Sequence, residues 1–178
     1  PSITNQVRVV NSKGQDTTPG EVGEIIVRGP NVMQEYYKDP EKTAEAIRGG
    51  WLYTDDLGKM DEDGFLMIVE RKKNMIISGG ENIYPKEVED VLYRHPKVVD
   101  AAVYGVPDKI WGEKVCAAIV LKAGEQMTVE EIIDFSKQNL ASFKKPKFVE
   151  FIDALPRNTI GKVQRSELKQ KFTENKSE

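Results

Sequence analysis

A lysine that directly follows a glycine, Lys162 in the stretch LPRNTIGKVQR, is the residue of this sequence best suited to chemistry on an anion. Lysine carries a compact charge on a flexible stem, and glycine lets the backbone beside it turn freely. A Gly-Lys pair is also typical of phosphate-binding P-loops, but that motif has another glycine five positions before Gly161, where this chain has Pro156. The sequence therefore predicts a cation in a polar loop that is not a P-loop.

Three further stretches combine polar residues in ways that suggest a site. SGGENIYP has paired glycines, which allow the backbone to approach a ligand closely. GWLYTDDLG contains the adjacent carboxylates Asp55 and Asp56, and adjacent like charges cost energy unless they are solvated or used. ERKKN brings three cations together between two apolar runs. Each stretch alone fits a solvated turn better than it fits a site.

A fourth pattern is a false lead toward calcium. Asp61, Asp63, Gly64 and Glu70 match four positions of an EF-hand loop, but Lys59 occupies the first ligand position. The apolar run that follows Gly64 reads as a strand, so DEDG is predicted to be a hairpin turn. No cluster of metal ligands is expected elsewhere in the chain.

The overall composition excludes several classes of function. The chain has 178 residues, and its 26 basic and 29 acidic residues give a net charge of -3, so nonspecific nucleic-acid binding has no electrostatic support. No apolar run approaches the roughly 18 residues that cross a bilayer. No signal peptide is visible, which predicts a cytoplasmic protein, and the start on Pro1 suggests a piece of something longer. Cys116 is predicted to be a buried bystander, and His95 a surface residue without a partner.

Hydrophobic patterning divides the chain into two differently built regions. The first is rich in strands, with one short helix that Asp39 can cap and Pro40 can begin. The second alternates helices with buried strands, and Thr128 with Glu131 forms a capping box at one helix start. The expected strands are 6–10, 24–29, 65–70, 98–106, 114–122 and 147–153, and the expected helices begin near 39, 85, 128 and 165.

Four stretches, in this order along the chain, resemble the C-terminal signature motifs of the adenylate-forming superfamily of acyl-CoA synthetases. They are GEIIVRGPNVMQEYY, GWLYTDDLG, ERKKNMIISGGENIYPKEVE and LPRNTIGKVQR, and the resemblance runs from about Val7 to Lys169. The third stretch looks most like the fatty acyl-CoA synthetase branch. Enzymes of this family activate a carboxylic acid with ATP to an acyl adenylate, release pyrophosphate, and transfer the acyl group to coenzyme A.

The resemblance implies roles for four residues. Lys162 matches the catalytic lysine that bridges the carboxylate and the α-phosphate during adenylation. Asp56 and Arg71 match the residues that hold the ribose hydroxyls of ATP or AMP. A carboxylate can accept hydrogen bonds from these hydroxyls, and a guanidinium can donate hydrogen bonds to them. Lys73 matches the hinge about which the C-terminal domain swings between the two half-reactions. Mg²⁺ is expected with ATP, but its ligands would lie outside this chain.

For coenzyme A, the resemblance implies a second group of residues. The loop Ser78, Gly79, Gly80 and Glu81 would line the pantetheine tunnel. Phe143 could stack on the adenine of coenzyme A. The remaining expected contacts with the coenzyme A nucleotide are Trp111, Lys145 and Lys147.

Two positions depart from the family pattern. Relatives usually have glycine where this chain has Asp55 and Glu35. If either glycine normally adopts a positive φ, the replacement strains the turn by about 1–2 kcal/mol. Asp55 also adds a negative charge beside the expected ribose ligand, which would weaken ATP binding.

The expected fold class is α+β: residues 1–70 as the strand-rich end of a large N-terminal domain, then residues 71–178 as a compact, mobile C-terminal domain with a small central sheet flanked by helices. The family's phosphate loop, adenine motif and acyl pocket do not occur in this chain, so the chain alone should turn over nothing. Its expected partners are a carboxylic acid, most consistent with a fatty acid, ATP, coenzyme A and the missing N-terminal domain. An aryl-CoA ligase or luciferase-like enzyme, a peptide-synthetase adenylation domain and a noncatalytic nucleotide-binding or interaction module remain alternatives.

Overall fold

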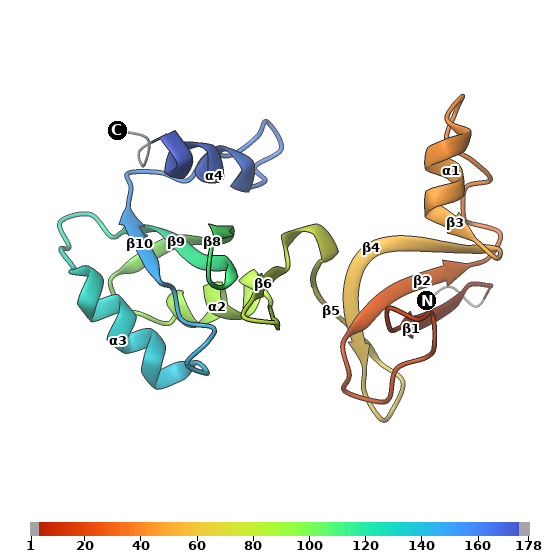
Figure 1. Cartoon of the computed structure of the whole chain (residues 1–178), viewed down its shortest axis with the longest axis horizontal. Helices are drawn as coiled ribbons and strands as arrows, with labels where there is room; N and C mark the ends of the chain where they lie inside the picture. The colour runs from red at the N-terminus through yellow and green to blue at the C-terminus, as the bar shows by residue number, and fades with distance from the viewer. Residues whose placement is uncertain (1–3, 175–178) are drawn as a thin grey trace. The chain divides into compact units, whose positions relative to one another are not determined.

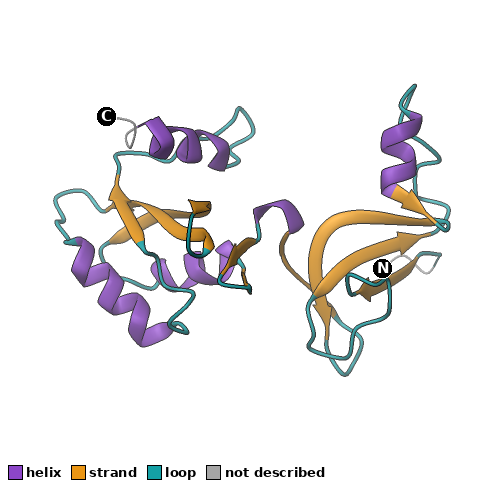
Figure 2. Cartoon of the chain, in the orientation of Figure 1, coloured by secondary structure: helices purple, strands orange, loops and turns teal. Residues whose placement is uncertain are grey.

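The computed structural model describes residues 4–174, which form two compact units that divide between Lys73 and Asn74 (Figure 1). Each unit has its own five-stranded sheet, and helices accompany both sheets (Figure 2). This confirms the α+β class expected from the sequence. The predicted boundary after Glu70 lies in the same segment, and residues 1–3 and 175–178 of the predicted domains lie outside the described residues.

Unit 1 is built on an antiparallel sheet in the order β1-β2-β4-β3, with β5 also paired to β4. Three of its strands confirm the expected ranges to within one residue, and Asp39 caps α1 by accepting a hydrogen bond from the Lys42 amide at 2.9 Å. The elements are β1 (Gln6–Val10), β2 (Gly23–Arg28), α1 (Pro40–Ala46), β3 (Ile47–Arg48), β4 (Trp51–Met60) and β5 (Leu66–Arg71).

The longest strand of unit 1, β4, was not expected from the sequence. Its pairing with β2 is irregular. Glu24 pairs with Leu57 and Ile26 pairs with Tyr53, so one residue of β2 lies opposite three residues of β4. The residues 54–56 therefore bulge from the ladder, and we call them the carboxylate bulge. β4 and β5 form a hairpin through the DEDG turn, in which Gly64 donates to the Asp61 carbonyl at 3.1 Å, as predicted.

Unit 2 has a mixed sheet around β9, which pairs antiparallel with β8 and with β6, and parallel with β10. Its elements are β6 (Ile76–Ser78), β7 (Glu81–Ile83), α2 (Pro85–Leu92), β8 (Val98–Asp108), β9 (Gly112–Leu121), α3 (Val129–Asn139), β10 (Phe148–Phe151) and α4 (Arg165–Glu174). The segment Lys72–Asn74, a short 3-10 turn, precedes β6. The predicted capping box of α3 is present, with Thr128 and Glu131 bonded reciprocally.

Both faces of the unit 2 sheet are covered, and alternate residues of β8 and β9 serve different cores. Ala101 and Ala117 face the core under α2 and α3, whereas Ala102 and Ala118 face the core under α4. Figure 1 shows α4 on one side of the sheet and α2 and α3 on the other. This two-sided burial explains why both strands read as continuous apolar runs.

Two single residues have different outcomes. Cys116 is fully buried in the core under α4, as predicted. His95 is half-buried, and the prediction that it has no partner was wrong. Its ring packs edge-on against Phe135 at 4.9 Å between centroids, and its Nδ1 accepts from the Lys97 amide at 3.3 Å. Burial lowers the pKa of His95. None of the helices in residues 4–174 combines the length and apolar character that a membrane crossing requires.

Candidate functional site

The stretch 155–165, which we call the lysine loop, connects β10 to α4 and folds back on itself. Arg157 and Val163 form an antiparallel bridge, and the Asn158 amide donates to the Lys162 carbonyl at 2.9 Å. The Asn158 side-chain oxygen accepts from the Lys162 amide at 2.8 Å, and Gly161 closes the turn with φ of +78°. The backbone that carries Lys162 is therefore held by short-range hydrogen bonds.

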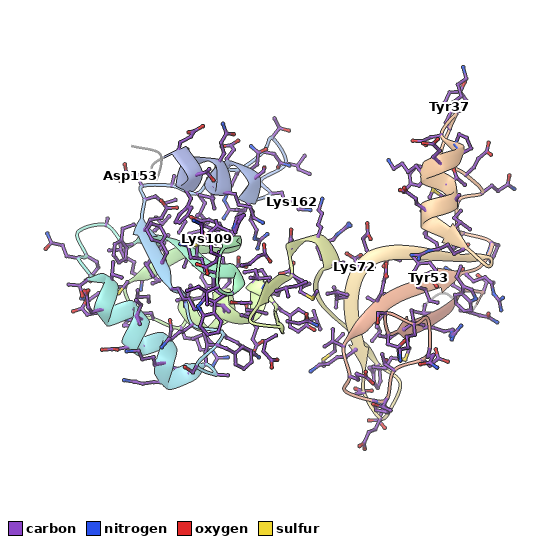
Figure 3. The ribbon with its side chains drawn as sticks, in the orientation of Figure 1. Tyr37, Tyr53, Lys72, Lys109, Asp153 and Lys162 are labelled. Carbon is purple, nitrogen blue, oxygen red and sulfur yellow. The ribbon has the colours of Figure 1, made fainter. Side chains whose placement is uncertain are left out.

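The Lys162 side chain extends from this loop into solvent (Figure 3). Among the residues that the structure describes, its ammonium group has no hydrogen-bond, ion-pair or ring partner. An exposed ammonium keeps its charge available to an incoming anion, since it does not have to leave another partner first.

An arginine ties the lysine loop to the sheet of unit 2. Arg157 donates from Nη1 to the Gly161 carbonyl at 2.8 Å and from Nη2 to Asp100 Oδ2 at 2.6 Å. Asp100 Oδ1 in turn accepts from the Tyr93 hydroxyl at 2.7 Å and from the Ala101 amide at 3.0 Å. Burial alone would raise the pKa of Asp100, but the hydrogen bonds from Arg157 and Tyr93 outweigh it and lower the pKa below its ordinary value.

In unit 1, the carboxylate bulge meets the end of β5. Asp56 and Arg71 are cross-strand partners, and Arg71 Nε lies 2.7 Å from Asp56 Oδ1. Thr54 holds the bulge in place, because its hydroxyl donates to the Ile25 carbonyl at 2.8 Å and accepts from the Asp56 amide at 3.1 Å. The two residues that the resemblance assigns to the ribose are thus direct neighbours, 15 positions apart in the sequence.

Asp55, at the middle of the bulge, has φ of +61°. This is the left-handed region that costs most residues about 1–2 kcal/mol and that aspartate tolerates better than most. Glu35 is not among the described residues with positive φ, so no backbone strain arises there. Asp55 and Arg71 also line a cavity of about 390 Å³, together with Tyr36, Lys42, Glu45, Ala46, Arg48, Tyr53 and Thr54.

The residues just before the expected hinge are fixed to unit 1. Lys72 Nζ lies 2.7 Å from Glu24 Oε2, and the Glu24 side chain is only 10% exposed. Glu24 Oε1 is buried, and no described residue offers it a hydrogen bond. Lys73 follows and is exposed.

The SGGE stretch is a tight hairpin and not the open loop that its composition suggests. Ser78 pairs with Glu81 across a two-residue turn in which Gly79 and Gly80 have φ of +63° and +84°. Positive φ at both central residues is the requirement of a type I′ turn. Ser78 is buried and also bridges to Gly112 of β9.

Trp111 and Lys147 lie beside this turn. The Gly79 amide donates to the Trp111 carbonyl at 2.8 Å, and a Cβ at Gly79 would come within 2.9 Å of the Trp111 ring. Lys147 Nζ sits 3.6 Å from the centroid of the same ring. The amides of Ile110 and Trp111 donate to Asp108 and lower its pKa. The turn at Ser78–Glu81, Trp111 and Lys147 are therefore brought together.

Two other expected contacts are not tied to this cluster by any described interaction. Phe143 is 40% exposed and lies next to Lys144, whose ammonium is 5.7 Å from the Phe143 centroid. Lys144 pairs with Glu87 at 2.6 Å. Lys145 is half-buried. Within residues 4–174, no group of three or more His, Cys, Asp or Glu side chains is placed to hold a metal ion.

Sequence reasoning missed the residues that support the lysine loop. Tyr93, Asp100 and Arg157 come from α2's end, β8 and the loop itself, and nothing in their spacing links them. Arg165 was read only as a helix residue, yet it donates to Glu89 at 2.7 Å and to the Val103 carbonyl at 3.0 Å. A guanidinium on each side of Lys162 was the only visible signal.

Comparison with known families identifies residues 87–162 as an AMP-binding enzyme C-terminal domain. The chain is 46% identical to 2-succinylbenzoate--CoA ligase of Geobacillus sp. (strain WCH70), over 99% of this chain and 36% of that protein. It is 49% identical to the long-chain-fatty-acid--CoA ligase of Bacillus subtilis (strain 168), over 91% of this chain and 29% of that protein.

A solved structure gives the same match. The o-succinylbenzoate CoA synthetase of Bacillus subtilis, in complex with its acyl-adenylate intermediate, superimposes with a TM-score of 0.87 and 42% identity, over 95% of this chain and 34% of that one. The chain thus spans about a third of the length of the relatives it matches.

Proposed function

This chain belongs to the adenylate-forming enzymes, whose C-terminal domain residues 87–162 match, and from that premise we propose that it is part of an acid–thiol ligase. In the first step, a carboxylate oxygen attacks the α-phosphorus of ATP and the bond to pyrophosphate breaks. In the second, the thiol of coenzyme A attacks the acyl carbon, loses its proton, and AMP leaves.

The single observation that carries this proposal is the exposed ammonium of Lys162, which has no partner within residues 4–174, on a loop whose backbone is held by hydrogen bonds. In the proposed step, negative charge grows between the carboxylate and the α-phosphate, and Lys162 stabilises it. Preorganised charge aimed at the transition state is the most effective kind of electrostatic catalysis, because it does not have to reorganise during the reaction. The fixed hydrogen bonds of Asn158 and the turn at Gly161 support this role.

Asp56 and Arg71 are proposed to bind the ribose. Arg71 occupies Asp56 Oδ1 through Nε, which leaves Oδ2 and the terminal guanidinium nitrogens for the two ribose hydroxyls. The ion pair orients both side chains before a nucleotide arrives. Their partial exposure is consistent with access from solvent.

Lys73 is proposed as the hinge between the half-reactions. The residues directly before it are tied to unit 1 by Arg71–Asp56 and Lys72–Glu24. The first residue without such an ion pair is Lys73, so a change of backbone angle is expected there. This is a gating role and adds nothing to the chemical step itself.

For the thioester step, we propose that coenzyme A passes the hairpin at Ser78, Gly79, Gly80 and Glu81. The contacts of Gly79 with Trp111 and of Lys147 with the Trp111 ring support a common surface there. Phe143 and Lys145 stay predictions as further contacts with the nucleotide of coenzyme A. Mg²⁺, when bound with ATP, would neutralise phosphate charge through ligands outside this chain.

The acid is proposed to be a fatty acid, because the third signature stretch looks most like that branch and a long-chain ligase is among the relatives. An aromatic acid is the second candidate, since a 2-succinylbenzoate--CoA ligase is 46% identical to this chain. A substrate screen of the intact ligase separates the two. A cytoplasmic location stays a prediction.

The test of the proposed function is a split assay of the intact ligase with Lys162→Ala. Pyrophosphate release reports adenylation, and preformed acyl adenylate with coenzyme A reports thioester formation. We expect adenylation to fall about 10³-fold while thioester formation survives. Lys122→Ala, which removes an exposed lysine after β9, is the matched control. Adenylation that is unchanged in Lys162→Ala would overturn the proposal. The 178-residue chain alone should form no acyl adenylate.

A further inference from the structure

A continuous line of hydrogen bonds connects the end of α2 to the residue before Lys162. The Tyr93 hydroxyl donates to Asp100, Arg157 donates to the other oxygen of Asp100, and the same guanidinium donates to the Gly161 carbonyl. All three distances lie between 2.6 and 2.8 Å. The peptide group whose carbonyl is held in this way ends at the Lys162 amide.

This line supplies what the loop's own hydrogen bonds do not. The bonds of Asn158 fix the loop's shape, but they connect loop residues only to one another. The side-chain link from Arg157 to Asp100 joins the loop to β8, 57 residues earlier in the chain. Leu155 and Val163 pack into the core under α4, and Arg165 donates to the Val103 carbonyl, so other parts of the loop are anchored separately. The Arg157 link acts on the Gly161–Lys162 turn itself.

The chemistry of the link requires arginine. A guanidinium has several donors in a rigid plane and can serve a carboxylate and a carbonyl together, whereas a lysine ammonium is one point on a flexible stem. Arg157 uses one terminal nitrogen for each acceptor. Lysine at this position would keep the charge but could not hold both acceptors in the same geometry.

A second arginine, Arg165, anchors a helix, whereas Arg157 holds the peptide group between Gly161 and Lys162. Arg165 binds Glu89 and the Val103 carbonyl, and both charged side chains of this pair are largely buried, at 19% and 13% exposed. Arg165 thus fixes the start of α4. Arg157 is more exposed, at 43%, and its carbonyl partner is the peptide that precedes Lys162.

We propose that Arg157 is a positioning residue for adenylation, which holds the Gly161–Lys162 peptide in place while Asp100 and Tyr93 hold its guanidinium. This inference rests on the proposed function of Lys162. In this proposal Arg157 touches no reacting atom and acts only by holding the backbone that carries Lys162. Small displacements of a catalytic group can cost about 10²-fold in rate, so the link should matter for the adenylation rate and little for ATP affinity.

The test uses the intact ligase and the same split assay. In Arg157→Lys we expect kcat for adenylation to fall about 10- to 100-fold, with KM for ATP and the thioester half-reaction within about 3-fold of the wild type. Asp100→Asn and Tyr93→Phe should show the same pattern with smaller losses of kcat. Asp100→Asn weakens the partner of Arg157, and Tyr93→Phe removes a hydrogen bond to Asp100, so both leave the bond from Arg157 to the Gly161 carbonyl in place. Glu87→Gln is the control, since it breaks an ion pair of unit 2 whose partners are exposed to the same two degrees in reverse order, Lys144 at 21% and Glu87 at 43%.

A double variant distinguishes positioning from general stability. In a Lys162→Ala background, Arg157→Lys should cause no further loss of adenylation, because there is no ammonium left to position. Hydrogen–deuterium exchange should rise in residues 156–164 of Arg157→Lys and stay unchanged in β8 and β9. This measurement remains informative even if a variant is inactive.

The outcomes separate the inference from the proposed function. If Lys162→Ala loses adenylation but Arg157→Lys behaves as the wild type, only the positioning role is overturned. If Arg157→Lys lowers both half-reactions equally, or lowers adenylation by its full factor in the Lys162→Ala background, the residue is structural and the inference also fails. If Lys162→Ala retains adenylation, the proposed function falls and the inference falls with it.

Discussion

The lysine loop and the carboxylate bulge both interrupt regular structure to present charge, but they do so in opposite ways. The lysine loop turns on a glycine, with φ of +78° at Gly161, and presents a cation without a described partner. The carboxylate bulge turns on Asp55, with φ of +61°, and presents a carboxylate that is already paired with Arg71. A free charge suits a transition state in which new charge appears, whereas a paired charge suits a ligand with neutral hydroxyls.

Among the variants that test the carboxylate bulge and the glycine turns, Asp56→Ala should have the largest effect. Charge-assisted hydrogen bonds contribute about 1.5–3 kcal/mol each, so KM for ATP should rise about 10- to 100-fold while kcat for adenylation changes little. This is the reverse of the Lys162→Ala signature, and steady-state kinetics at varied ATP measures both.

The control for Asp56→Ala is Asp16→Ala. Asp16 is also a carboxylate of unit 1 that forms an ion pair with an arginine Nε, that of Arg8 at 2.6 Å. It should leave KM for ATP unchanged. A loss of kcat without a change in KM in Asp56→Ala would erase the proposed contrast between the two regions.

An intermediate effect is expected from Gly161→Val. No atom lies within 4 Å of a Cβ at this position, so the cost is conformational only, about 1–2 kcal/mol for a side chain at positive φ. The loop should then leave its ordered shape part of the time, and adenylation should fall about 10-fold with thioester formation intact.

Gly124→Val is the matched control for that strain. Gly124 has φ of +80° and equally open space, but it lies in the turn after β9. It should lower the melting temperature without affecting adenylation. Equal losses of adenylation in both variants would mean that the loop's shape has no special role.

The smallest expected effect is a gain from Asp55→Gly. Glycine accepts φ of +61° without cost and removes a negative charge next to Asp56, so KM for ATP should fall about 2- to 5-fold, the size of one screened charge. Lys38→Gly relieves positive φ, here +54°, at another site in unit 1 and should change stability alone. An unchanged KM in Asp55→Gly would show that the extra carboxylate does not reach the nucleotide.

Local signals predicted the helix starts and the buried strands well. Asp39 and the Thr128–Glu131 capping box act within one helical turn. Because β8 and β9 are buried on both faces, their sequences are continuous apolar runs. By contrast, β4 was missed because its bulge puts two adjacent carboxylates into a strand. The hairpin at Gly79 was missed because each of its strands has only three residues.

The candidate site was harder to predict than the elements that carry it. That Asp56 and Arg71 belong together came from the resemblance, since the register of β4 and β5 that pairs them cannot be read from spacing. The link between Arg157 and Asp100 depends on how the lysine loop returns to β8, a tertiary contact with no local signature. Single residues such as His95 were misread for the same reason.

The connectivity of the unit 2 sheet also bears on the order in which the unit assembles. β8 and β9 pair over ten registered positions across a connection of only three residues, 109–111, whereas β10 joins β9 after the whole of α3 has intervened. Short loops close at the smallest entropic cost, so we expect this hairpin to form early during folding. Asp100 would then be in place before the lysine loop packs against the sheet. We expect that loop to be among the last parts of unit 2 to become ordered during folding and among the first to unfold locally.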